Sequence, residues 1–154
     1  MGFMQQNFNP NKHTVFVPIN KEKYIGNDYP IMRSEWERKI AQWLDTNQEV
    51  VSWSSERLAI EYFDPVRMSK RRYYPDFLAK MVSKNGKEVI YLIEVKPSKE
   101  TQPPRKSSKK TRKTLLKEQS VYMTNMAKFK AAEIYCRKMG WIFKVLTEKQ
   151  MFNK

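Results

Sequence analysis

Cysteine and histidine each occur once in this 154-residue chain, as Cys136 and His13. A single cysteine excludes an internal disulfide and a cysteine-based zinc site, and one histidine near the N-terminus argues against histidine-led catalysis. No apolar run approaches the roughly 18 residues that a membrane span requires. The N-terminus lacks the features of a secretory signal, and Gly2 is not followed by the hydroxyl residue of a myristoylation site. We therefore expect an intracellular protein that is neither secreted nor membrane-bound.

Acidic residues are scarce relative to basic ones. The chain has 30 Lys and Arg against 16 Asp and Glu, which gives a formal net charge of +14. A field of this sign attracts polyanions, and nucleic acid is the most common of them. An anionic membrane is the rival partner, but no segment has the pattern of a basic amphipathic anchor helix. The charge favours a nucleic-acid partner and indicates no particular reaction.

Hydrophobic periodicity divides the chain into an N-terminal extended arm over residues 1–31 and a single domain over residues 32–154. A basic loop is expected over about residues 97–114, and Thr147 is expected to cap a short terminal helix. The expected helices cover 34–45 and 115–139, and the expected strands cover 50–54, 58–63, 73–82, 88–95 and 141–146. This order predicts an α/β fold with a central mixed sheet flanked by helices.

Two charged residues, Glu94 and Lys96, share one face at the end of a strand that is apolar on both faces. Charges at such a position are unfavourable unless they have a role. Asp76 lies across the expected hairpin, and the turn at Asn85-Gly86 decides what it faces. A two-residue turn places Asp76 opposite Val95, whereas a three-residue loop over 84–86 places it opposite Glu94. We predict the three-residue loop, because it requires Gly at its last position; a bulge is another route to the same face.

The two carboxylates, Asp76 and Glu94, repel each other when they are opposed unless a cation or a proton lies between them. Mg²⁺ takes one or two carboxylates, keeps several waters and accepts phosphate oxygens. A divalent ion can acidify an attacking water and neutralise charge on a phosphodiester, and Lys96 can stabilise the charged transition state. The alternative is a strand-end salt bridge in a protein without catalytic activity.

Pro75-Asp76 followed by Glu94-Val95-Lys96 resembles the signature of the PD-(D/E)-x-K nuclease superfamily, whose members have the restriction-endonuclease-like fold. Within it, the sequence is similar to the branch of end-cleaving subunits of heteromeric transposases and head-completion nucleases of large tailed phages. The similarity covers about residues 32–150 and includes the segments 33–37, 74–77 and 93–97. A C-terminal set also contributes, with Lys128, Ala132, Cys136, Gly140, Phe143 and Thr147-Glu148.

The resemblance implies that Asp76 and Glu94 ligate a metal ion, with the backbone carbonyl of Val95 as a further ligand. It implies that Lys96 is the catalytic lysine, and that Glu37 is the acidic residue that the family often carries on its first helix. Glu37 has a rival interpretation as the acidic member of a capping box that closes the helix start. The implied cofactor is Mg²⁺, with Mn²⁺ as a substitute.

Several basic residues near the expected site are candidates for contacts with DNA phosphates. They are Arg71, Arg72, Lys99, Arg105, Lys106, Lys109, Lys110, Arg112 and Lys113. A solvated surface without a fixed partner is the alternative. Gln119 and Lys128 on the second expected helix could also face the site, and the sequence does not decide it.

The expected function is a Mg²⁺-dependent DNA endonuclease that acts on packaged DNA during virion assembly. Phage portal or head proteins are possible further partners, and cutting both strands would favour a homodimer. One alternative is a non-catalytic basic protein that binds DNA in the filled head. Another is an end-cleaving transposase subunit that requires a partner protein. The expected location is the host cytoplasm or the virion.

Overall fold

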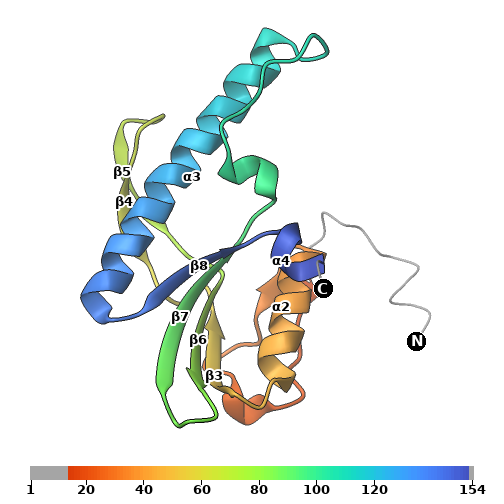
Figure 1. Ribbon diagram of the computed structural model, residues 1–154, viewed down its shortest axis with the longest axis vertical. Helices are drawn as coiled ribbons and strands as arrows, with labels where there is room; N and C mark the ends of the chain where they lie inside the picture. The colour runs from red at the N-terminus through yellow and green to blue at the C-terminus, as the bar shows by residue number, and fades with distance from the viewer. Residues whose placement is uncertain (1–13, 153–154) are drawn as a thin grey trace, which may run out of the picture.

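The computed structural model describes residues 14–152. Its centre is a four-stranded sheet with the order β3-β6-β7-β8, in which the first two pairs are antiparallel and the last is parallel (Figure 1). The strands are β3 (Val50–Ser55), β6 (Phe77–Val82), β7 (Glu88–Val95) and β8 (Ile142–Leu146). Helices flank this sheet, which confirms the predicted mixed α/β class. None of the helices within residues 14–152 could span a bilayer.

The β6–β7 hairpin has the predicted three-residue loop over residues 84–86. The Ser83 N–H donates to the Lys87 carbonyl at 2.9 Å, which closes the ladder directly before the loop. Gly86 has a φ of +82°, in the left-handed region that a side chain disfavours. The Asn85-Gly86 pair therefore fixes the register of the whole hairpin, as the sequence predicted.

This register brings two carboxylates to the same end of the hairpin. The ladder ends at the pair Phe77 and Ile93, and Asp76 and Glu94 are the next residues on their strands. The register of a two-residue turn, in which Asp76 would oppose Val95, is not adopted.

Helix α2 (Glu35–Thr46) covers one face of the sheet (Figure 1). The Ser34 side chain caps it by accepting the Glu37 N–H at 3.1 Å. The apolar side of α2 packs against Trp53 of β3 and against Ile93 and Val95 of β7. The amphipathic spacing that predicted this helix is confirmed, and it places α2 beside the odd-numbered residues of β7.

Helix α3 (Arg112–Met139) lies on the opposite face, because it packs on Leu92, and successive side chains of a strand point to opposite faces. The helix ends at Gly140, whose φ is +73°. It begins at Arg112 rather than at the predicted residue 115, because Thr111 caps it by accepting the Thr114 N–H at 3.1 Å. The predicted basic loop is therefore shorter at this end.

A second hairpin, formed by β4 (Ile60–Asp64) and β5 (Ser69–Tyr73), lies beside α3 (Figure 1). The prediction of one strand over residues 73–82 was wrong, since Tyr73 ends β5 and Phe77 begins β6. Pro75 separates the two strands, because it has no N–H to donate to a ladder. The first four residues of β5 are all exposed, so this strand has no alternating apolar pattern by which it could be predicted.

Residues 14–33 pack against α2 and β3. Strand β1 (Thr14–Val15) pairs with β2 (Ile31–Met32), and the segment that connects them in the sequence contains the 3₁₀ helix η1 (Lys21–Lys23). Asp45 of α2 accepts the backbone N–H groups of residues 19 and 20 at 2.8 and 3.0 Å, and Phe16 is buried in the core under α2. The first part of the expected arm, residues 1–13, lies outside the described residues.

Hydrogen bonds join the segments that follow β7 and β8. The 3₁₀ helix η2 (Ser98–Thr101) follows β7, and the short helix α4 (Glu148–Phe152) follows β8. Glu148 accepts the Ser98 N–H at 2.9 Å and also the Ser98 hydroxyl. Thr147 accepts a backbone N–H of α4 at 3.2 Å, which confirms its predicted capping role. These contacts fix the chain directly after Lys96.

Candidate active site

Asp76 lies in the short link between β5 and β6. Its Oδ2 atom accepts the backbone N–H of Val95 at 2.8 Å. Burial raises the pKa of Asp76 well above its usual range, and the charges of Glu94 and then Glu37 raise it further. Asp76 is therefore close enough to both Glu94 and Glu37 for their charges to act on it.

Glu94 is almost fully buried, with 3% of its surface exposed. The Tyr73 hydroxyl donates to its Oε1 atom at 2.8 Å, and the Lys96 Nζ atom lies 3.2 Å from its Oε2 atom. Burial raises the pKa of Tyr73, and the charge of Glu94 raises it further, so the hydroxyl remains a donor. Both oxygens of Glu94 have a donor, which holds the carboxylate in one orientation.

Lys96 lies at the end of β7 with 25% of its side chain exposed. Burial alone would lower the pKa of Lys96, but the carboxylates of Glu94 and Asp76 outweigh burial and raise it. The side chain is therefore a positively charged ammonium beside two carboxylates. Such a group can stabilise negative charge that develops on a bound substrate.

Glu37 has two sets of contacts, and they correspond to its two interpretations. Its N–H donates to Ser34 Oγ at 3.1 Å, and its Oε2 atom accepts the Arg33 N–H at 3.0 Å. These bonds resemble a capping box, except that the carboxylate reaches the residue before the cap. The same side chain raises the pKa of Asp76. Glu37 therefore closes the start of α2, and its charge also acts on Asp76.

The donor set suits a hard divalent cation. Two oxygen donors here are the carboxylates of Asp76 and Glu94, and the Val95 carbonyl stays a predicted further ligand. Within residues 14–152, no three Asp, Glu, His or Cys side chains gather closely enough to hold a metal ion on their own. Mg²⁺ needs only one or two carboxylates, because waters and substrate phosphates complete its shell. A cation between Asp76 and Glu94 would also relieve the repulsion that raises the pKa of Asp76.

Three residues near this site were missed or undecided in the sequence. Tyr73 was assigned to the wrong strand, so its contact with Glu94 was not foreseen. Lys128 of α3 lies 5.6 Å from the ring centre of Tyr73 and lines the same groove as Lys96. Asn125 lines that groove as well. The one feature of the sequence that could have indicated this is its position three residues before Lys128, which puts both on the same side of a helix.

The predicted nucleic-acid-binding residues fall into two groups. Arg71 and Arg72 of β5 line the groove that contains Lys96. The others lie along η2, the following segment and the first turn of α3, which extends away from the sheet (Figure 1). This second group is Lys99, Arg105, Lys106, Lys109, Lys110, Arg112 and Lys113. Within it, Lys110 pairs with Glu118 of α3 at 2.9 Å.

A mixed sheet with apposed Asp76, Glu94 and Lys96 at the end of a central strand defines the class of the protein, a nuclease with the restriction-endonuclease-like fold. The sequence matches the family described as TnsA-like endonuclease N terminal over residues 47–148. The chain belongs to this family. It is 40% identical over 137 residues to the head completion nuclease of Enterobacteria phage T4, covering 86% of this chain and 89% of that relative. Nucleases of this kind generally use divalent metal ions.

Proposed function

We propose that the chain is a Mg²⁺-dependent DNA endonuclease that hydrolyses phosphodiester bonds with a water nucleophile. The observation that carries this proposal is the apposition of Asp76, Glu94 and Lys96. The Glu94 carboxylate lies 3.2 Å from the ammonium of Lys96. The Asp76 carboxylate accepts the N–H of Val95, the residue between these two, at 2.8 Å. Mn²⁺ is expected to substitute for Mg²⁺, because both ions prefer oxygen ligands.

Each residue has a distinct proposed role. Asp76, Glu94 and the Val95 carbonyl would hold the metal ion, which when bound supplies an acidified water and neutralises charge on the phosphate. Lys96 would orient the attacking water and stabilise the charge that develops on the phosphate oxygens. Glu37 would position a water beside Asp76. These groups need no covalent intermediate, so inversion at phosphorus is expected.

The biological setting is proposed from the T4 relative, which is named a head completion nuclease. We infer that this chain acts on packaged DNA during virion assembly, in the host cytoplasm or the virion. Portal or head proteins are its proposed further partners. The identity of 40% extends over 86% of the chain, which supports the same setting for this protein. A homodimer would allow both strands to be cut at one position.

The basic surface supports DNA as the substrate. The net charge of +14 provides long-range attraction to a polyanion. The segment from Lys99 to Lys113 is proposed to contact phosphates outside the active site, since it is rich in basic residues and its backbone extends away from the sheet (Figure 1). Contacts of this kind position the substrate without reading its sequence.

The test is nicking of supercoiled plasmid in Mg²⁺, in Mn²⁺ and in EDTA. Wild type is compared with Asp76→Asn and with Asp28→Asn, a matched control at an exposed loop position. DNA binding of each protein is measured in EDTA, so that loss of cutting is separated from loss of binding.

Cutting that requires the metal and disappears only in Asp76→Asn would support the proposal. DNA binding by the wild type without cutting in either metal would overturn it and favour a non-catalytic DNA-binding protein. Cutting that appears only after a partner protein is added would instead favour an end-cleaving transposase subunit.

A further inference from the structure

A groove of about 450 Å³ lies between α3 and the β4–β5 hairpin, which run side by side in Figure 1. Tyr62 and Arg71 line it from the hairpin, and Asn125 and Lys128 line it from α3. Lys96 also lines this groove. The groove is therefore continuous with the candidate active site.

The lining of the groove is predominantly basic. Its basic residues are Arg67, Arg71, Arg72, Lys96 and Lys128, and its carboxylates are Asp64 and Glu100. Asp64 is already engaged, because its Oδ1 atom accepts two backbone N–H groups of the β4–β5 turn at 2.9 and 3.1 Å. A groove with this excess of positive charge favours an anionic occupant.

Asn125, a lining residue of the groove, carries a buried donor that lacks a partner within residues 14–152. Only 4% of its surface is exposed, and its Nδ2 atom has no hydrogen-bond partner among the described residues. A buried amide without an acceptor is unfavourable, and such groups are rare in folded proteins. An acceptor that enters the groove with a ligand would satisfy this donor once the Asn125 amide turns toward it.

Lys128 lies one helical turn after Asn125, so the two side chains share a face of α3. Its Nζ atom is 5.9 Å from the ring centre of Tyr62 and 5.6 Å from that of Tyr73. No ion pair within residues 14–152 includes Lys128. Burial lowers the pKa of Lys128, and the charge of Lys96 lowers it further, so an anion bound here would favour its charged form.

We propose that Asn125 and Lys128, with Arg71 across the groove, bind a phosphate of the DNA backbone next to the scissile phosphate. The substrate strand then reaches the active site along this groove. An amide donor and two cations suit a phosphodiester, which offers two oxygens that share one negative charge and has no donor. The inference rests on the proposed function, since it takes DNA as the substrate.

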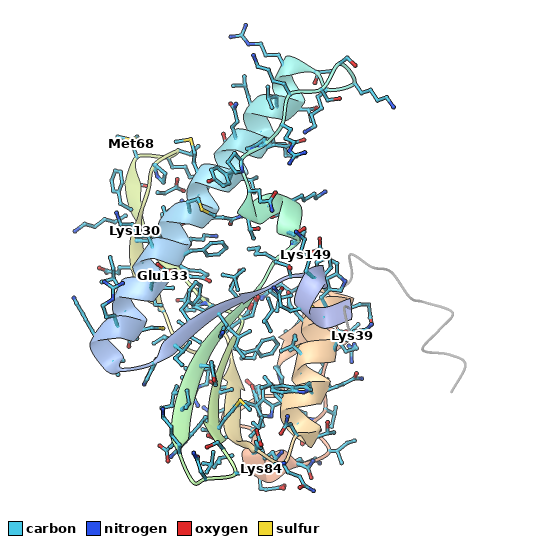
Figure 2. The ribbon with its side chains drawn as sticks, in the orientation of Figure 1. Lys39, Met68, Lys84, Lys130, Glu133 and Lys149 are labelled. Atoms are coloured by element: carbon cyan, nitrogen blue, oxygen red, sulfur yellow. The ribbon has the colours of Figure 1, made fainter. Side chains whose placement is uncertain are left out.

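The test is binding of a short fluorescein-labelled DNA duplex to the full chain in EDTA, measured by anisotropy over a range of salt concentrations. The variants are Asn125→Leu, Lys128→Gln and Arg71→Gln. The control is Lys130→Gln, which removes the same charge from the same helix; Lys130 (labelled in Figure 2) is exposed and is not a lining residue of the groove. The melting temperature of every variant is measured in parallel.

Asn125→Leu is expected to weaken binding about tenfold without lowering the melting temperature, because the removed Nδ2 atom has no protein partner. Lys128→Gln and Arg71→Gln should each reduce the slope of log affinity against log salt by about 0.9. Lys130→Gln should change that slope less than either.

Wild-type affinity in a folded Asn125→Leu variant would overturn the proposal. If Asn125→Leu does not fold, an equal effect of Lys128→Gln and Lys130→Gln on the salt slope would overturn it. Absence of DNA binding by the wild type would reject both the groove and the DNA substrate. Binding that depends on the groove residues, without Mg²⁺-dependent cutting, would reject only the catalytic proposal.

Discussion

Replacing Asp76 by Asn should stabilise the metal-free protein while it abolishes cutting. Asp76 shares its surroundings with Glu94 and Glu37, and burial together with these two charges raises its pKa well above 3.8. The negative form of Asp76 is therefore unfavourable in the folded protein. An asparagine has nearly the same shape and is neutral at every pH, and its side-chain oxygen can still accept the Val95 N–H.

The sign and size of the effect follow from linkage. A folded-state pKa above the unfolded value means that the native state binds more protons than the unfolded state. The contribution of Asp76 to stability is therefore fully present below its unfolded pKa and is lost as the pH rises through its folded pKa. Each unit of increase in that pKa corresponds to about 1.4 kcal/mol. For a domain of this size, that energy shifts the melting temperature by roughly 4 °C.

The assay is thermal unfolding in EDTA between about pH 4 and pH 8, with wild type, Asp76→Asn and the Asp28→Asn control. Asp76→Asn should melt above wild type at neutral pH, and the difference should shrink toward acidic pH. Addition of Mg²⁺ should raise the melting temperature of wild type and not that of Asp76→Asn, because a ligand stabilises only the protein that binds it. A variant that melts below wild type at every pH would refute the reasoning, since the stronger hydrogen bond that an ionised carboxylate accepts from the Val95 N–H would then outweigh the repulsion.

Three further substitutions test the site and its support. Glu37→Gln should keep the melting temperature of wild type, because Gln can make the same capping bond. It should lower the nicking rate at least about tenfold, and an unchanged rate would leave Glu37 with the capping role alone. Tyr73→Phe should lower the nicking rate roughly tenfold by releasing Glu94, with a higher Mg²⁺ requirement in a titration; a wild-type titration would contradict this. Gly86→Ala should lower stability in urea unfolding by about 1 kcal/mol through its positive φ, since no atom lies within 4 Å of the added Cβ; an unchanged midpoint would show that the loop adapts.

Local sequence rules predicted the parts of the fold that depend on a few neighbouring residues. The Asn85-Gly86 pair specified a loop with a left-handed glycine, and that loop determined which residues of β6 and β7 face each other. Ser34 and Gly140 marked helix ends for the same reason, because capping satisfies backbone groups within one turn. The convergence of Asp76 with Glu94 follows from this one turn.

Contacts between distant elements were not accessible in the same way. Strand β5 forms because it pairs with β4, and its exposed basic residues carry no periodic signal of that pairing. The sequence therefore placed Tyr73 in the next strand and did not predict the hydrogen bond that its hydroxyl donates to Glu94. The sequence did not single out Asn125 and left Lys128 undecided, because only the packing of α3 beside the hairpin brings them to the groove that Lys96 lines.

The two faces of β7 explain why the site is both rigid and open to substrate. Ile93 and Val95 point into the core under α2, which anchors the strand where the Val95 N–H holds Asp76. Glu94 and Lys96 alternate with them and point to the other face, where α3 and the β4–β5 hairpin leave a groove. A shift of β7 by one residue would exchange these faces and bury Lys96 in the apolar core. The same turn that places Asp76 next to Glu94 therefore also decides that Glu94 and Lys96 lie on the sheet face where the groove is found, and Lys96 lines that groove.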